Sequence, residues 1–87
     1  MRVVKLFVKS NCSRCPAAKQ VGEDLKREGV TVVEYDVETA DGLAEASFHS
    51  IQATPSFIVE DNDENTIADF RGDVPTVQAI RDIITPD

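Results

Sequence analysis

The two cysteines of this chain stand close together, in the segment Ser10-Asn11-Cys12-Ser13-Arg14-Cys15-Pro16, and the 87 residues contain no others. Two intervening residues allow both sulfur atoms to reach disulfide distance across the first turn of a helix. A thiolate attacks a disulfide to give a mixed disulfide, which a second thiol can then resolve. The spacing therefore predicts thiol–disulfide exchange, with Cys12 as the attacking sulfur and Cys15 as the resolving one.

Positive charge stands close to the first cysteine. A segment with helical periodicity follows the pair, so we expect Cys12 at a helix N-terminus, where free N–H groups and the helix dipole favour a thiolate. Cys15 is expected one turn inside the helix, where it is more shielded. Arg14 lies between the cysteines, and Lys9 lies three residues before Cys12. Both cations would lower the pKa of the Cys12 thiol further, which increases the fraction of the attacking thiolate.

Metal binding is the main alternative chemistry for such a pair. A structural zinc site takes four ligands, whereas this chain offers two cysteines and one histidine, His49. A zinc site within one chain is therefore disfavoured, but a zinc or iron–sulfur site shared between two chains remains open. We expect His49 to be an ordinary surface residue of a helix and not a catalytic base for Cys12.

The elements around the cysteines indicate a βαβ unit. Residues 3–8 are nearly continuously apolar, interrupted only by Lys5, which is typical of a strand covered on both faces. Pro16 fits the first turn of the helix that follows. The apolar face of that helix consists of Ala18, Val21, Gly22 and Leu25. Residues 30–37 are rich in β-branched side chains, which favours a second strand. This order predicts two parallel strands with a right-handed crossover.

The second half of the sequence adds a helix, a hairpin and a final helix. Thr39 can cap the first of these helices. Its expected apolar face consists of Leu43, Ala44, Ser47, Phe48 and Ile51. Residues 56–59 and 66–70 read as two short strands, and the acidic segment 60–65 between them predicts the solvated tip of an antiparallel hairpin. The last amphipathic helix, which precedes the tail 85–87, presents Val77, Ile80, Ile83 and Ile84.

Length and charge limit the classes of function. The length predicts one domain, residues 1–87. Nine basic and 16 acidic residues give a net charge of -7, which argues against a nucleic-acid partner because phosphate binding needs a basic face. No apolar run has the roughly 18 residues of a membrane span. Residues 1–8 predict a strand and not a signal peptide, so we expect a cytoplasmic protein, in which a close cysteine pair favours catalysis or metal binding over a structural disulfide.

With these features, the chain resembles the thioredoxin/glutaredoxin superfamily over essentially its whole length. The resemblance is carried by Cys12-Ser13-Arg14-Cys15-Pro16 after the first strand, by Thr54-Pro55 before the third, and by Gly72-Asp73 at the end of the last. It implies an α/β thioredoxin fold, β-α-β-α-β-β-α, with a four-stranded mixed sheet of order 2-1-3-4 and helices on both faces. It also implies that Pro55 is cis and lies against the cysteine pair, and that the backbone of Thr54 pairs with a bound peptide or glutathione.

The motifs distinguish between subfamilies. Lys9 matches the glutaredoxin lysine near the glutathione carboxylate, but the glutaredoxin Cys-Pro-Tyr-Cys is absent and Arg71-Gly72-Asp73 has one glycine where that family has two. The Trp-Cys-Gly-Pro-Cys of ordinary thioredoxins is absent as well. Residues 15–19, Cys-Pro-Ala-Ala-Lys, look like the small glutaredoxin-sized thioredoxins of methanogenic archaea and some anaerobic bacteria. Those proteins are dithiol reductants.

This best match implies a monomeric protein disulfide reductase that needs no cofactor beyond its own redox-active disulfide. Its substrates would be disulfide-containing proteins, and a separate thioredoxin-type reductase would regenerate it. The expected substrate site consists of Lys9, Arg14, Thr54, Pro55, Gly72 and Asp73. A glutathione-dependent glutaredoxin is the alternative within the superfamily. A dimeric iron–sulfur or zinc module that uses the same cysteines is the alternative outside it.

Overall fold

The computed structural model describes residues 2–84, and the expected tail 85–87 lies outside them. The elements are β1 (Val3–Val8), α1 (Cys15–Arg27), β2 (Thr31–Asp36), α2 (Ala40–Phe48), β3 (Ser56–Glu60), β4 (Thr66–Arg71) and α3 (Val77–Ile84). Their order confirms the prediction β-α-β-α-β-β-α. No helix in this part of the chain is long and apolar enough to cross a membrane.

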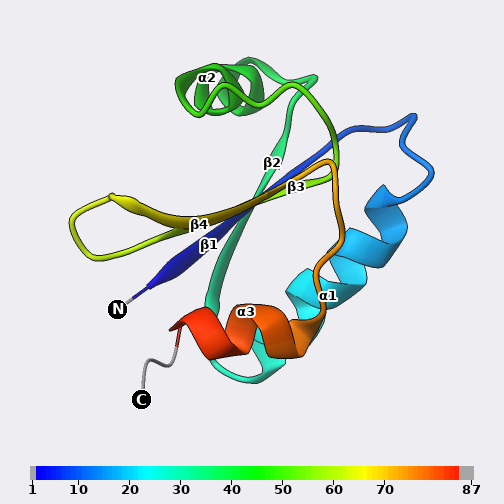
Figure 1. Ribbon diagram of the computed structural model, residues 1–87. Coiled ribbons are helices and arrows are strands. Elements are labelled where there is room, and N and C mark those ends of the chain that lie inside the picture. The colour runs from blue at the N-terminus through cyan, green and yellow to red at the C-terminus, as the bar shows by residue number, and fades with distance from the viewer. Residues whose placement is uncertain (1, 85–87) are drawn as a thin grey trace.

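The strands form one mixed sheet in the order β2-β1-β3-β4, as predicted (Figure 1). β1 pairs with β2 in parallel, whereas β3 is antiparallel to both β1 and β4. Phe7 near the end of β1 lies opposite Ser56 at the start of β3. The loop that leaves β1 and the loop that enters β3 therefore meet at one end of the sheet.

Helices cover both faces of the sheet. α1 and α3 lie together on one face and α2 lies on the other (Figure 1). Alternate side chains of β1 and β3 belong to two separate cores, because successive residues of a strand point to opposite faces of the sheet. The larger core, beneath α1 and α3, contains Val4, Leu6, Val8, Cys15, Ala18, Leu25, Phe57, Val59 and Ile80. The smaller core, beneath α2, contains Phe7, Ala46 and Ile58.

Gly22, which belongs to the predicted apolar face of α1, lets this helix lie close to the sheet. A Cβ atom at this position would lie 3.3 Å from Cδ2 of Leu6 and 3.6 Å from Cγ1 of Val32. That separation is tight for carbon atoms, so a larger residue would push the helix outward. Because α1 carries Cys15, this approach also sets the height of the cysteine pair above the sheet.

The apolar face predicted for α2 is wrong except for Ile51, which packs against the smaller core, and the predicted cap is correct. The hydroxyl oxygen of Thr39 accepts a hydrogen bond from the Gly42 N–H at 3.0 Å. Leu43 and Phe48, however, are 57% and 78% exposed, and Gly42 and Ala46 face the sheet instead. A Cβ at Gly42 would lie only 1.8 Å from the carbonyl oxygen at the end of β2, so the helix approaches through its small residues and turns Leu43 and Phe48 outward.

The predictions for His49 and Glu60 also need correction. His49 is 9% exposed and is not a surface residue, and Glu60 is the buried last residue of β3 and not part of a solvated tip. Glu60 shares a sheet face with Lys5, because Lys5 pairs with Ile58, two residues before Glu60. Oε2 of Glu60 lies 3.1 Å from Nζ of Lys5 and 3.2 Å from Nε2 of His49. These contacts compensate for its burial.

Candidate active site

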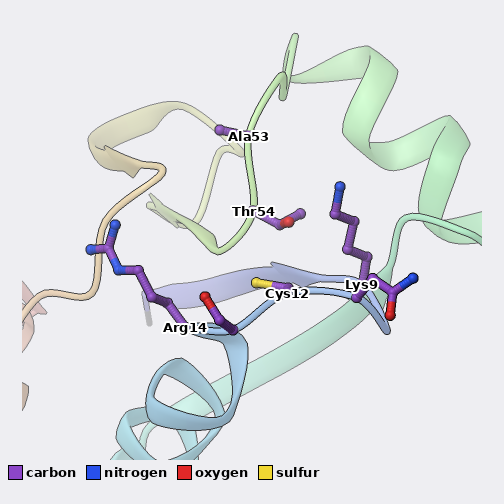
Figure 2. A pocket seen from close by; sticks show the side chains of 7 residues that line it. Lys9, Cys12, Arg14, Ala53 and Thr54 are labelled. Carbon is purple, nitrogen blue, oxygen red and sulfur yellow. The ribbon is translucent and has the colours of Figure 1, made fainter.

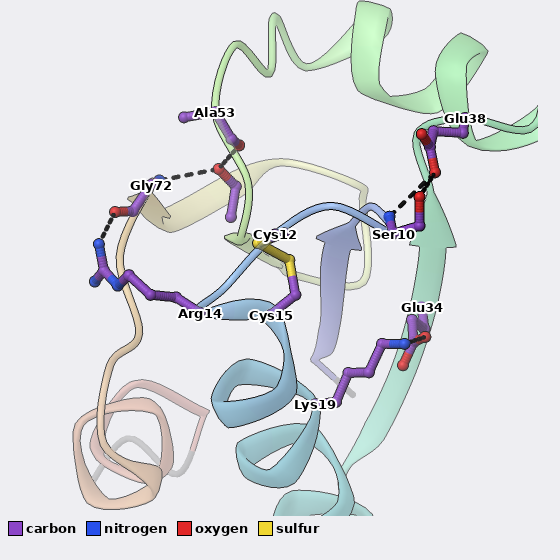
Figure 3. Close-up of a disulfide and its surroundings, with 10 residues drawn as sticks. Ser10, Cys12, Arg14, Cys15, Lys19, Glu34, Glu38, Ala53 and Gly72 are labelled. Carbon is purple, nitrogen blue, oxygen red and sulfur yellow. Dashed lines mark hydrogen bonds and ion pairs between the residues drawn. A yellow bond between two sulfur atoms is a disulfide. The ribbon is translucent and has the colours of Figure 1, made fainter.

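Cys12 and Cys15 form a disulfide at the start of α1, with their Cα atoms 5.3 Å apart (Figure 3). The Cys15 N–H donates to the Cys12 carbonyl oxygen at 3.3 Å, which closes a turn. Cys15 is the first residue of α1, so the expectation that it lies one turn inside the helix is wrong. Pro16 accounts for this start, because a proline lacks the N–H that an interior helical position requires. Arg14 occupies the N-cap, and Cys12 lies on the turn before the helix.

The two cysteines differ in accessibility. Cys15 is 2% exposed and belongs to the core beneath α1 and α3. Cys12 is only partly buried and lines a surface pocket together with Lys9, Arg14 and Thr54 (Figure 2). A substrate disulfide that enters this pocket therefore meets the sulfur of Cys12 first.

Arg14 connects the cysteine loop to the segment that follows β4 (Figure 3). Its guanidinium donates to the Gly72 carbonyl oxygen at 3.1 Å and to Oδ1 of Asp73 at 3.3 Å. The Asp73 N–H in turn donates to the Pro55 carbonyl oxygen at 3.1 Å. Hydrogen bonds thus link the cysteine loop, the Thr54–Pro55 loop and the Gly72-Asp73 segment around the pocket.

The Thr54–Pro55 peptide bond is cis, and Pro55 is fully buried at the start of β3. The hydroxyl of the neighbouring Ser56 donates to the Ala53 carbonyl oxygen at 2.7 Å and accepts from the Gly72 N–H at 3.1 Å. These bonds hold the loop beside the disulfide, and Thr54 lies across the pocket from Cys12 (Figure 2).

Lys9 borders two adjoining hollows. One is the pocket of Cys12. The other is lined mainly by apolar side chains from the residue after β2, from α2 and from the loop after α2, which include Val37, Leu43 and Ile51. Lys9, Ala53 and Thr54 line both. The surface beside Cys12 is therefore a continuous groove with one cationic side chain at the junction.

Glu38 is a neighbour of the site that the sequence did not reveal. Its Oε1 accepts hydrogen bonds from the Ser10 hydroxyl at 2.8 Å and from the Ser10 N–H at 3.1 Å. The hydrogen bond from the Ser10 hydroxyl has the largest effect and lowers the pKa of Glu38. The hydrogen bond from the Ser10 N–H and the positive charge of Lys9 act in the same direction. The only sequence signal was the Ser10-Asn11 turn, because Ser10 and Glu38 lie 28 residues apart.

The structure does not bring the candidate metal ligands together. Within residues 2–84, no group of three or more His, Cys, Asp or Glu side chains is placed to hold a metal ion. His49 contacts Lys5 and Glu60 beneath α2, and it does not line the pocket of Cys12.

Comparison with known proteins identifies the family. A family model described as the thioredoxin domain matches residues 2–85. The chain belongs to the thioredoxin domain family. A probable thioredoxin from Archaeoglobus fulgidus is 37% identical over 62 residues, which make up 70% of this chain and 68% of that protein. Membership of this family and a cysteine pair at disulfide distance together support a thiol–disulfide oxidoreductase.

Solved thioredoxin structures share the fold. A mutant thioredoxin from Halobacterium salinarum superposes with a TM-score of 0.80 at 21% identity, over 95% of this chain and 71% of that one. Thioredoxin-2 of the malaria parasite gives 0.80 at 17% identity, over 97% of this chain and 81% of that one. At these identities the similarity concerns the thioredoxin fold alone, and it matches the predicted fold class.

Proposed function

We propose that this protein reduces disulfide bonds in protein substrates by dithiol exchange through Cys12 and Cys15. The observation that carries the proposal is the unequal exposure of the two sulfurs. Cys12 lines an open pocket, whereas Cys15 is 2% exposed directly behind it. Such an arrangement suits one cysteine that meets the substrate and a second that acts only after the first has reacted.

The proposed reaction transfers two electrons in two exchange steps. In the reduced protein, the Cys12 thiolate attacks a substrate disulfide, forms a mixed disulfide and releases one substrate thiolate. The Cys15 thiolate then attacks the Cys12 sulfur, forms the Cys12–Cys15 disulfide and releases the second substrate thiolate, and both released thiolates take up protons from water. The disulfide form described above is the product of this sequence.

The groove beside Cys12 would position the substrate. An extended substrate segment would pair with the backbone of Thr54, and a neighbouring side chain would enter the apolar hollow beyond it. Lys9, at the junction of the two hollows, would attract an acidic group on that segment. Arg14, Gly72 and Asp73 would frame the opposite side of the pocket and hold the loop of Pro55 in place.

The electrons would come from a separate thioredoxin-type reductase, since the sequence has no glycine-rich nucleotide motif. We propose that the protein acts as a monomer in the cytoplasm, where thiols are kept reduced. Sedimentation of the reduced and oxidised protein would test the monomer.

Insulin reduction driven by dithiothreitol tests the activity, and a parallel assay with glutathione and glutathione reductase tests the donor. We expect turnover with dithiothreitol and none above background with glutathione. Fast turnover with glutathione would instead assign a glutaredoxin. Metal analysis and the visible absorbance of anaerobically purified protein test the shared iron–sulfur or zinc site, and stoichiometric metal held by a dimer would overturn the proposal.

Lys9 provides a test of the substrate groove. Replacement of an exposed cation that meets an acidic group on a substrate should raise KM by about two- to fivefold with little change in kcat. Lys9→Gln should show this effect with an acidic substrate. Lys19→Gln is the matched control, because the Lys19 side chain is 52% exposed on α1 and does not line the groove. An equal effect of both replacements would show that only net charge matters.

A further inference from the structure

A second pocket lies at the end of the sheet away from the disulfide. α2, β1, β2 and the turn between β3 and β4 all contribute to its lining, and its volume is about 630 Å³. In the antiparallel pair of β1 and β3, Val3 lies opposite Glu60 at this end, whereas Phe7 lies opposite Ser56 at the other end, next to the Cys12 loop. A partner in this pocket would therefore leave the Cys12 groove open.

The lining of this pocket is strongly acidic. Four carboxylates line it, those of Glu45, Glu60, Asp61 and Glu64, and Lys5 is the only cation among the lining residues. The net charge of the chain is -7, so the surrounding field has the same sign. Both the local and the overall charge favour a cationic occupant.

Lys5 lies at the buried side of the pocket and does not satisfy all of these carboxylates. Its Nζ donates to Oε2 of Glu45 at 2.5 Å. Oε2 of Glu60 is buried between Nζ of Lys5 at 3.1 Å and Nε2 of His49 at 3.2 Å, which are charge contacts without a well-directed hydrogen bond. The Glu60 side chain is 5% exposed and lines the pocket, so a buried carboxylate borders the space that an occupant would enter.

Aromatic side chains complete the pocket. Phe48 is 78% exposed, and its ring makes a T-shaped contact with the His49 ring, with centroids 5.0 Å apart. Tyr35 of β2 also lines the pocket and stacks on Phe7 with ring centroids 5.3 Å apart. An exposed ring beside carboxylates attracts a cation through its face. A guanidinium fits this combination better than an ammonium, because it can stack on a ring and bind a carboxylate through two N–H groups at once.

We infer that this pocket, formed by Lys5, Tyr35, Glu45, Phe48, Glu60 and Glu64, is a docking site for an arginine side chain on the surface of a partner protein. The guanidinium would stack on Phe48 and donate to the carboxylates of Glu45 and Glu64. The site would add affinity for a basic partner at a distance from the disulfide, without taking part in the exchange chemistry.

Backbone amide NMR of the full chain tests this inference with a defined probe, the capped tripeptide Gly-Arg-Gly. Its citrulline analogue is the neutral control, and the lysine analogue tests the preference for a guanidinium. We expect saturable shifts at amides near Phe48 and Glu64 with the arginine peptide, a weaker response to the lysine peptide and none to the citrulline peptide. The shifts should decrease as salt rises, since exposed charges are screened.

Two variants and a control locate the site. Phe48→Ala should weaken binding of the arginine peptide by about two- to fivefold, the usual range for an exposed cation–π contact. Glu64→Gln should weaken it by a similar factor. Leu43→Ala is the matched control, because Leu43 is also exposed on α2 but does not line this pocket. Phe48→Ala and Glu64→Gln should reduce 5,5′-dithiobis(2-nitrobenzoate), a small disulfide, at the rate of the unmodified protein, because neither residue lines the Cys12 groove.

Three results would overturn the inference. The first is equal shifts with the citrulline peptide, and the second is an equal loss of binding in Leu43→Ala. The third is saturation of the same amides by Ca²⁺ at lower concentration than by the arginine peptide, which would assign a cation site. The proposed disulfide reduction is independent of these results, because it is measured in the small-disulfide assay.

Discussion

Replacement of Lys5 by methionine should destabilise the protein strongly, because Lys5 neutralises buried acid beneath α2. The side chains of Lys5 and Glu60 are 15% and 5% exposed, and their charges lie 3.1 Å apart. The loss of one partner of a buried ion pair costs about 3–5 kcal/mol, because the remaining charge is left without compensation. Glu45, the other acidic neighbour, is 27% exposed and can be solvated, so we expect a loss near the lower limit, about 3 kcal/mol.

The pH dependence of this loss follows from two pKa shifts. The hydrogen bond from Lys5 lowers the pKa of Glu45 below 4.5, so that contribution is present above pH 4.5 and disappears as the pH falls through the lowered value. Burial alone would lower the pKa of Lys5, but the interactions with the carboxylates of Glu45 and Glu60 outweigh it and raise the pKa above 10.5. The Lys5 contribution is therefore complete below pH 10.5 and disappears as the pH rises through the raised value.

Urea unfolding at pH 3, 7 and 11 measures the free energies of unfolding. The double variant Lys5→Met/Glu60→Met is the control, because it replaces the pair by apolar side chains of similar length. We expect it to recover to within about 1 kcal/mol of the unmodified protein at pH 7. Two results would refute the reasoning. One is a loss of unfolding free energy below about 1 kcal/mol in Lys5→Met. The other is a loss in the double variant equal to the sum of the losses in Lys5→Met and Glu60→Met.

Three further predictions concern the site and its supports. Gly42→Ala should lose about 3 kcal/mol of unfolding free energy, because the new Cβ would lie 1.8 Å from the Asp36 carbonyl oxygen; a loss below about 1 kcal/mol in urea unfolding would contradict this packing. Arg14→Gln should change stability by less than about 1 kcal/mol, because its ion pair is exposed, yet the pocket amides should shift in NMR spectra. Ser10→Ala should raise the pKa of Glu38 towards 4.5 by removal of the hydroxyl hydrogen bond, and an NMR titration that shows no rise would refute that contact.

The sequence predicted the features that depend on local patterns. The cysteine spacing, the start of α1 near Pro16, the Thr39 cap and the order of the strands all rest on residues that are near neighbours in the chain or on regular periodicity. Gly22 lies in the predicted apolar helical face, and the structure adds that Leu6 is the sheet residue nearest to it. These patterns fix the element types and bring the cysteine pair to the end of β1.

The features that the sequence did not predict depend on contacts between distant residues. Lys5 and Glu45 lie 40 residues apart, and no local pattern shows that they meet above Glu60. The prediction of the buried face of α2 was wrong for a similar reason. Leu43 and Phe48 have helical spacing, but the close contact of Gly42 with the end of β2 decides which face is buried.

The most direct test of the central claim is trapping of a mixed disulfide with single-cysteine variants. Reduced Cys15→Ser protein, offered a protein disulfide, should accumulate a covalent complex through Cys12, because the resolving thiol is absent. Reduced Cys12→Ser protein should form none, since Cys15 is 2% exposed behind the pocket. Intact mass spectrometry and peptide mapping would identify the linked cysteine. A complex in Cys15→Ser alone is the result that the proposed roles predict, and a complex through Cys15 in Cys12→Ser protein would contradict them.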